Sequence, residues 1–192
     1  MVPRTTLIVL CYCLSFYWFS PRVPLKDSTP PAPEKVQVLT VGKTVTVNGT
    51  TLPLPATRAD VITLLGKPSR IVEVANTILT WDEHGLYATE DPKPEQIIAF
   101  TVALDKRDYP YWPKKLFRGT ARVDGAIVTA RSTIKDINHS KKGESFTRNS
   151  FLPDTWSIAH GDVLLTLVEA DPKLKNDKAN FSYLQIGVSL KP

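Results

Sequence analysis

The chain has 192 residues, a hydrophobic fraction of 42%, a charged fraction of 22% and four Trp, which excludes a wholly disordered protein. Its formal net charge of +5 is spread along the chain without a long basic run, so no nucleic-acid partner is expected. The length allows one ordinary domain or two small ones.

Residues 1–20 predict a membrane anchor or signal peptide. The uncharged stretch LIVLCYCLSFYWF follows Arg4, and it is shorter than the roughly 20 residues that a full span needs. Aromatic residues at 16–19 stand where a signal peptidase requires small ones, which favours an uncleaved inner-membrane anchor over cleavage after Ser15 or a lipoprotein. We therefore expect the folded part in the periplasm or outside, or exported if the segment is cleaved.

Residues 21–35 predict an extended linker, because they contain five prolines and no periodic apolar face. Cys11 and Cys13 are the only two cysteines of the sequence, and both lie in the apolar segment. The folded part is therefore expected to have no disulfide and no cysteine nucleophile.

An internal repeat predicts two related lobes, 36–108 and 109–192. The Val-Asn-Gly at 47–49 corresponds to the Val-Asp-Gly at 123–125, and His84-Gly85 corresponds to His160-Gly161. Both pairs have the same offset of 76 residues (123 − 47 and 160 − 84). A shared offset in the same order along the chain favours duplication over chance.

Each lobe is predicted to be α+β, an antiparallel sheet with one helix on a face, in the order ββ-α-βββ. Asn-Gly and Asp-Gly between alternating segments are strong hairpin signals. Thr57 and Thr133 are predicted helix N-caps, with Asp60 and Asp136 three residues later in the first turn. Strands are expected over about 76–81, 85–89 and 97–104 of the first lobe.

The stretch WDEHG at 81–85 contains residue types that bind metals, but its position between two strands favours a solvated hairpin turn. The second lobe keeps the His and the Gly but replaces both acids. One alternative stays open, in which His84 and His160 meet and bind zinc or iron together with Asp82 and Asp162. No metal-ligand spacing supports that site, and no cofactor is expected.

The segment YPYWPKKLFRG at 109–119 joins the lobes and is the predicted partner-binding surface. Its aromatic residues offer rigid contact area, and its basic residues would attract an acidic target. The predicted binding residues are Tyr109, Tyr111, Trp112, Lys114, Lys115 and Arg118. The alternative is that Tyr111 and Trp112 fill a groove between the sheets. In the binding interpretation, Trp112→Ala weakens the complex without unfolding the protein.

The stretch TRADVITLLGKPSRI…TILTWDEHGLYA, within residues 57–88, resembles the small bacterial outer-membrane assembly lipoproteins. The tandem β-lactamase inhibitor protein also has this helix-on-sheet layout, and the overall layout is similar to that of type VI secretion immunity proteins. These resemblances imply a rigid sheet surface that binds another protein.

No serine-nucleophile elbow or phosphate loop is present. We therefore expect a non-enzymatic, envelope-anchored protein that occludes a toxin. An envelope assembly or scaffold factor is the first alternative, and a metal-dependent hydrolase using His84 and His160 is the second.

Overall fold

The structure is a computed structural model that describes residues 35–93, 95–170 and 180–188, and these belong to a single structural unit. The predicted anchor at 1–20 and the predicted linker at 21–35, apart from Lys35, lie outside the described residues. Within the described ranges, no helix is both long enough and apolar enough to cross a membrane.

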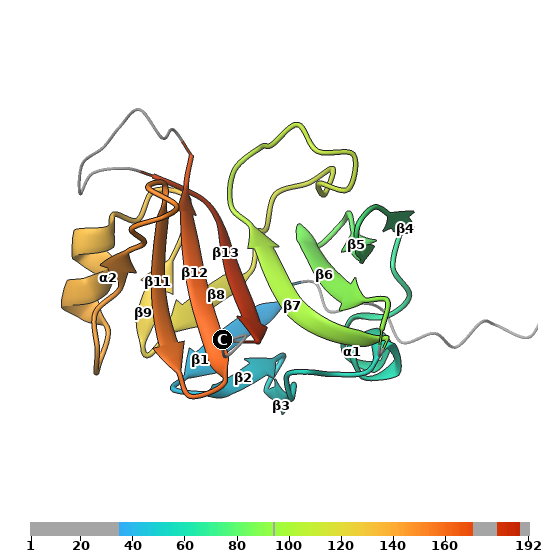
Figure 1. The fold of residues 1–192 in the computed structure, drawn as a ribbon, viewed down its shortest axis with the longest axis horizontal. Coiled ribbons are helices and arrows are strands. Elements are labelled where there is room, and N and C mark those ends of the chain that lie inside the picture. Colours follow the sequence, from blue (N-terminus) through green and yellow to red (C-terminus); the bar gives the residue numbers. More distant parts are fainter. Residues whose placement is uncertain (1–34, 94, 171–179, 189–192) are drawn as a thin grey trace, which may run out of the picture. The chain divides into compact units, whose positions relative to one another are not determined.

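The smaller sheet has five strands in the order β3-β2-β1-β8-β9 (Figure 1). Its strands are β1 (Gln37–Val41), β2 (Thr44–Val47), β3 (Thr50–Thr51), β8 (Thr120–Val123) and β9 (Ala126–Val128). β1 pairs antiparallel with β2 and parallel with β8, so one strand joins the two halves of the chain. The predicted turns form as expected, because Asn48, Gly49, Asp124 and Gly125 all adopt positive φ.

The larger sheet has eight strands in the order β10-β11-β12-β13-β7-β6-β5-β4. Its strands are β4 (Arg70–Glu73), β5 (Thr77–Trp81), β6 (Leu86–Asp91), β7 (Gln96–Ala103), β10 (Thr147–Arg148), β11 (Thr155–His160), β12 (Val163–Glu169) and β13 (Phe181–Val188). All neighbours are antiparallel, and β7 pairs with β13 at the centre. The two halves of the chain therefore form one continuous sheet.

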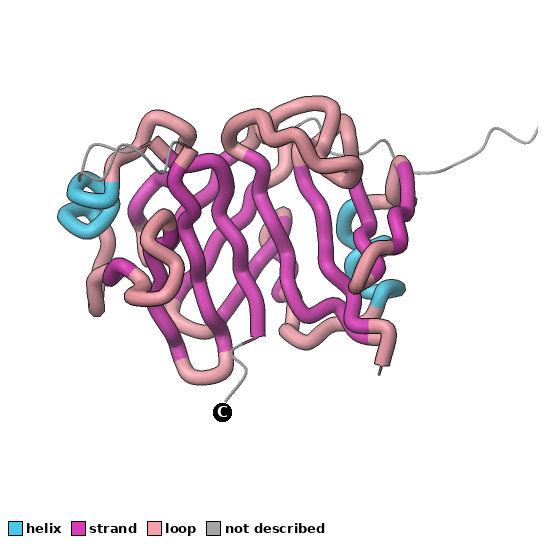
Figure 2. The backbone as a smooth tube through the Cα atoms, turned by 45° about the horizontal axis from the view of Figure 1, so that its top comes forward, coloured by secondary structure: helices cyan, strands magenta, loops and turns pink. Residues whose placement is uncertain are grey.

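The helices α1 (Arg58–Leu65) and α2 (Ile134–Ser140) lie at opposite sides of the strands (Figure 2). Both predicted N-caps are confirmed: the hydroxyl of Thr57 accepts the backbone N–H of Asp60, and Thr133 accepts that of Asp136. The helices bury their apolar residues in the core between the two sheets, which also contains the buried side chains of Phe100, Phe146 and Phe181.

The fold class is α+β with a large share of strand, but the expectation of a separate sheet in each lobe was wrong. Each half places its hairpin in the smaller sheet and its later strands in the larger sheet. The reason is edge pairing. β1 of the first half pairs with β8 of the second, and β7 pairs with β13, so hydrogen bonds join the two halves in both sheets. The helices consequently close the sides of a shared core and do not each cover a separate sheet.

The two halves are related by a local twofold arrangement. In the larger sheet, Thr101 and Gln185 face each other at the centre of the β7–β13 pair. In the smaller sheet, Leu39 of the central β1 faces Thr46 on one side and Arg122 on the other. Thr46 and Arg122 are separated by the 76-residue offset of the sequence repeat (122 − 46). The strand that has no counterpart, β1, therefore lies on the symmetry axis.

Candidate functional site

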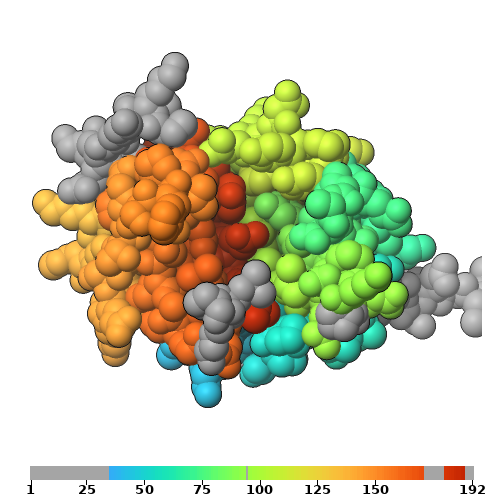
Figure 3. All heavy atoms as spheres, in the orientation of Figure 1, coloured from blue at the N-terminus to red at the C-terminus, as the bar shows by residue number. Residues whose placement is uncertain are grey.

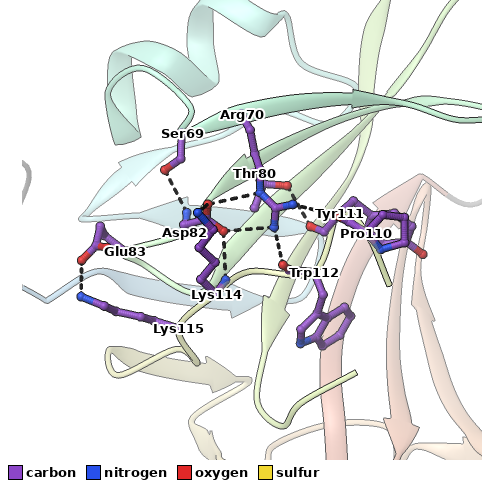
Figure 4. A network of polar contacts seen from close by, with 10 residues as sticks. All are labelled: Ser69, Arg70, Thr80, Asp82, Glu83, Pro110, Tyr111, Trp112, Lys114 and Lys115. Carbon is purple, nitrogen blue, oxygen red and sulfur yellow. Dashed lines mark hydrogen bonds and ion pairs between the residues drawn. The ribbon is translucent and has the colours of Figure 1, made fainter. Parts of the chain in front are cut away.

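The connection between β7 and β8, residues 104–119, is held in place by a part-buried ion pair. Arg70 on β4 donates from Nε and Nη2 to the carboxylate of Asp82 at 3.2 and 3.1 Å (Figure 4). The same guanidinium donates to the backbone carbonyls of Pro110 and Trp112. Asp82 also accepts the backbone N–H of Lys114 at 2.9 Å. One arginine thus links the sheet to the connection at several points.

The WDEHG turn contacts this connection through its backbone. The residue Gly85 has φ +68, and a Cβ there would lie 2.2 Å from the backbone nitrogen of Phe117. The turn backbone also accepts the N–H of Lys115, through the carbonyl of Asp82, at 3.2 Å. At the surface, Lys115 pairs with Glu83. The connection packs directly against this turn and leaves no room for a Cβ at residue 85, which is why glycine stands there.

Aromatic side chains of the connection pack on the outer face of the larger sheet. Trp112 is only 6% exposed and contacts the rings of Tyr87 and Tyr183, with centroids 5.6 and 5.7 Å away. Tyr111 packs beside Tyr87 and stacks on Tyr109, which is 48% exposed. The expectation that Trp112 is an exposed anchor was therefore wrong. The alternative of a plug between the sheets does not describe it either, since this cluster is separate from the core.

Burial has an electrostatic consequence for the tyrosines of this cluster. It raises the pKa of the Tyr87 and Tyr183 phenols above the ordinary value, because the charged phenolate is disfavoured away from water. Tyr109 and Asp154 add to the effect at Tyr183. Since Asp154 belongs to the β10–β11 loop, Tyr183 lies near both that loop and the 104–119 connection.

The β10–β11 loop, residues 149–154, presents two apolar side chains that sequence inspection missed. Phe151 is 90% exposed and Leu152 is 55% exposed. The loop is nevertheless ordered by hydrogen bonds, because Oδ1 of Asn149 accepts the backbone N–H of Phe151 and Leu152 at 2.8 and 3.1 Å. An Asn side chain that bonds the backbone two residues further on forms an Asx-turn, which fixes the local backbone.

A second arginine clamps this loop. Arg148 donates to the carbonyl of Pro153 and, at 2.8 Å, to the carboxylate of Glu169. Its guanidinium also lies over the ring of Trp156, 4.6 Å from the centroid. The backbone N–H of Glu169 donates to Asp154 at 2.8 Å, so the loop is fixed at both its beginning and its end.

Glu169, at the end of β12, connects the two loops. Its carbonyl accepts Arg107 of the 104–119 connection, while its carboxylate binds Arg148. The side chain is fully buried, and its Oε2 has no hydrogen-bond partner within the described residues. The 104–119 connection is therefore bonded to the backbone carbonyl of Glu169, and the β10–β11 loop is bonded through Arg148 to its buried carboxylate.

The loops border a hollow on the outer face of the larger sheet. In the space-filling view of Figure 3, orange atoms around residue 150 and yellow-green atoms of the 104–119 connection stand on its two sides. Red atoms of β13 lie between them. Tyr109, Lys114, Lys115 and Arg118 are exposed on the connection. We name Tyr109, Phe151 and Leu152, with these basic residues, the loop surface.

The structure does not bring the predicted metal ligands together. His84 lies in the β5–β6 turn and His160 ends β11. Because β6 and β12 are separated by three antiparallel steps, their beginnings lie at opposite ends of the sheet. Asp82 is engaged by Arg70, and Asp162 lies in the turn after His160. The His84–His160 pairing was therefore wrong, because the twofold arrangement separates the two turns.

The chain is thus a two-sheet α+β protein with two clamped loops beside one face of its larger sheet. Residues 37–138, more than half of the chain, match the family described as Domain of unknown function (DUF7738), and the chain belongs to that family. No curated protein and no solved structure matches it significantly.

Proposed function

We propose that this protein is a non-enzymatic protein-binding module of the cell envelope, and that it acts by occluding a toxin as an immunity protein. The observation that carries the proposal is the loop surface. Two ordered loops present a large aromatic or aliphatic side chain to solvent, and each loop is held by an arginine that bonds its backbone carbonyls.

Physical chemistry supports a binding role for such loops. An exposed Phe on an ordered loop costs little further entropy when a partner covers it, so most of its contact energy contributes to affinity. Aromatic residues are enriched at interface cores, where a few residues each cost about 2 kcal/mol or more of binding free energy when they are truncated. A rigid, ordered surface would suit an immunity protein, because pre-organised interfaces change shape little when they bind.

The charge of the surface favours an acidic protein as the partner. Lys114 is 77% exposed at its side chain, and Arg118 is also exposed. Lys115 is partly compensated by Glu83. Basic residues at the rim of an interface attract an acidic target and speed association.

We also infer that the two halves arose by duplication. The support is the correspondence of the sequence repeat with the twofold arrangement of strands about Leu39 and the Thr101–Gln185 pair. The β10–β11 loop is elaborated in the second half only, since β4 and β5 are joined by the short connection 74–76. The proposed binding loop is therefore a feature gained by one copy.

The experiment is affinity capture with the full 192-residue chain from native envelope extracts, followed by titration of the captured protein against variants. Phe151→Ala should weaken the complex at least tenfold. The matched control is Ile127→Ala, which removes a side chain that is 51% exposed on β9, away from the loop surface. Equal affinity of wild type and Phe151→Ala would reject the proposed surface.

The identity of the partner separates the two binding roles. A secreted toxin whose activity is blocked at equimolar chain supports immunity. An abundant resident envelope protein, bound through the same residues, would replace immunity with assembly or scaffolding.

A further inference from the structure

A pocket of about 440 Å³ lies at the other end of the larger sheet from the loop surface. Four turns meet there, and its lining includes Val41, Gly42, Asp124, Gly125, Lys142 and His160. Gly42 and Gly125 have open space where a Cβ would be, so a ligand can approach the backbone. The volume is in the range of small-molecule sites.

A buried polar cluster forms one wall of this pocket. Asp124 accepts the backbone N–H of Gly42 at 2.8 Å, and its Oδ2 lies 3.3 Å from Nζ of Lys141 and 3.1 Å from Nε2 of His160. The side chain of Lys141 is 0% exposed and also donates to the carbonyls of Lys142 and Glu144. Burial raises the pKa of Asp124, but the hydrogen bonds from Gly42 and Lys141, together with the interaction with His160, outweigh it and hold the pKa below its ordinary value.

The other half of the chain shows that the fold does not need these charges. At the same offset of 76 residues, Asn48 corresponds to Asp124, Leu65 to Lys141 and His84 to His160. Asn48 performs the same backbone role, since its Oδ1 accepts the N–H of Gln37 at 2.9 Å. Leu65 is buried in the core. A neutral amide and a leucine at these two positions are therefore compatible with the fold.

Burying a lysine and an aspartate is costly compared with apolar side chains of similar volume. A charged cluster that replaces neutral residues in one half only, and that faces a pocket, has the character of a ligand site. Both oxygens of Asp124 are already engaged, so the groups left to meet an oxyanion are the Nδ1–H that His160 carries in its imidazolium form, the exposed Lys142 ammonium and the turn backbone.

We propose that this pocket binds a small oxyanion, carried by a carboxylate or phosphate group. Asp124 orients the imidazole of His160, Lys141 balances the negative charge of the Asp124 carboxylate, and the exposed Lys142 supplies a further positive charge. The glycine turns allow close contact with backbone N–H groups, which bind oxyanions in many turns. The site is independent of the proposed protein-binding function, because it lies at the opposite end of β12 from Glu169.

The test is a titration of the full chain with inorganic phosphate, followed by NMR of the histidine rings. The sequence contains three histidines, so His84 and His139 serve as internal controls. We expect a saturable shift at His160 alone, and none with sodium chloride at matched ionic strength. Equal shifts at all three rings, or a linear shift at His160, would overturn the proposal.

Two variants complete the test. Lys142→Ala removes an exposed side chain and should raise the dissociation constant for phosphate at least fivefold. The double variant Asp124→Asn with Lys141→Leu installs the residues of the other half, so it should fold and lose the saturable shift. Wild-type phosphate binding by both variants would rule the site out, and acetate used as a second probe distinguishes carboxylate from phosphate preference.

Discussion

Glu90 and Glu169 occupy equivalent places in the two halves, and each is buried against an arginine. Glu90 follows a bulge on β6 opposite Ile97, and Glu169 follows a bulge on β12 opposite Phe181. Their partners come from different elements, since Arg58 begins α1 and Arg148 ends β10. The two halves thus share a buried acid at this place and differ in its arginine partner, and the arginine of the second half also bonds the β10–β11 loop.

Loss of Arg70 should destabilise the protein strongly. In Arg70→Leu, Asp82 keeps its buried position without its guanidinium partner, and breaking a buried pair in this way costs about 3–5 kcal/mol. Because the Arg70 side chain is 28% exposed, we expect the lower part of that range. Urea unfolding measures it. Lys115→Ala, which removes the exposed pair with Glu83, should change the free energy of unfolding by less than about 1 kcal/mol.

Two glycines at corresponding turns should respond differently to alanine. Gly161 has φ +64 with open space where the alanine Cβ would lie, so Gly161→Ala costs only the left-handed backbone conformation, about 1–2 kcal/mol. Gly85→Ala adds a collision with the backbone of Phe117 and should cost clearly more. Thermal unfolding of the two variants side by side gives the difference. Equal losses would show that the 104–119 connection moves away from the turn without penalty.

Trp112→Ala should reduce stability, contrary to the expectation from sequence that it would affect only binding. Removing a buried Trp from its contacts with Tyr87 and Tyr183 costs about 3–5 kcal/mol. Phe151→Ala, at a side chain that is 90% exposed, should stay within about 0.5 kcal/mol of wild type. Denaturant midpoints of the two variants show whether each side chain contributes to stability. A Trp112→Ala protein of wild-type stability would contradict the packing of this aromatic cluster.

The stability of the protein should depend on Asp124 at acid pH. Because its pKa is lowered in the folded state, its contribution is present above the ordinary Asp value of about 3.9 and is lost as the pH falls through the folded value. In Asp124→Asn, the free energy of unfolding should therefore decrease less between neutral and acid pH than it does in the wild type. An unchanged dependence on pH would mean that Gly42, Lys141 and His160 do not stabilise the carboxylate.

Local features of the fold could be predicted from the sequence because they depend on neighbouring residues. The turns at Asn48-Gly49 and Asp124-Gly125 require only positive φ at small residues. The Thr57 cap requires only an acid three residues later, and Asp60 accepts the Thr57 backbone N–H in return. The hairpin at WDEHG follows from the same local rules.

The candidate site could be predicted only in part. The 104–119 connection stands out by its composition, but which of its aromatic residues is exposed depends on contacts with Tyr87 and Tyr183, far away in the sequence. The β10–β11 loop could not be found in this way, because Phe151 is a typical core residue type, and the bonds of Asn149 and Arg148 that hold its loop outward appear only in the folded structure.

The sequence by itself determined the turns, the helix caps, the repeat and the basic, aromatic character of one connection. Each of these depends on chemistry within a few residues or on comparison of the chain with itself. Only the tertiary structure decided that the halves share two sheets, that Trp112 is covered, and that Asp124, Lys141 and His160 meet at one pocket. The physical reason is that strand pairing and side-chain packing bring together residues that are far apart along the chain. The local sequence around each residue does not specify these partners.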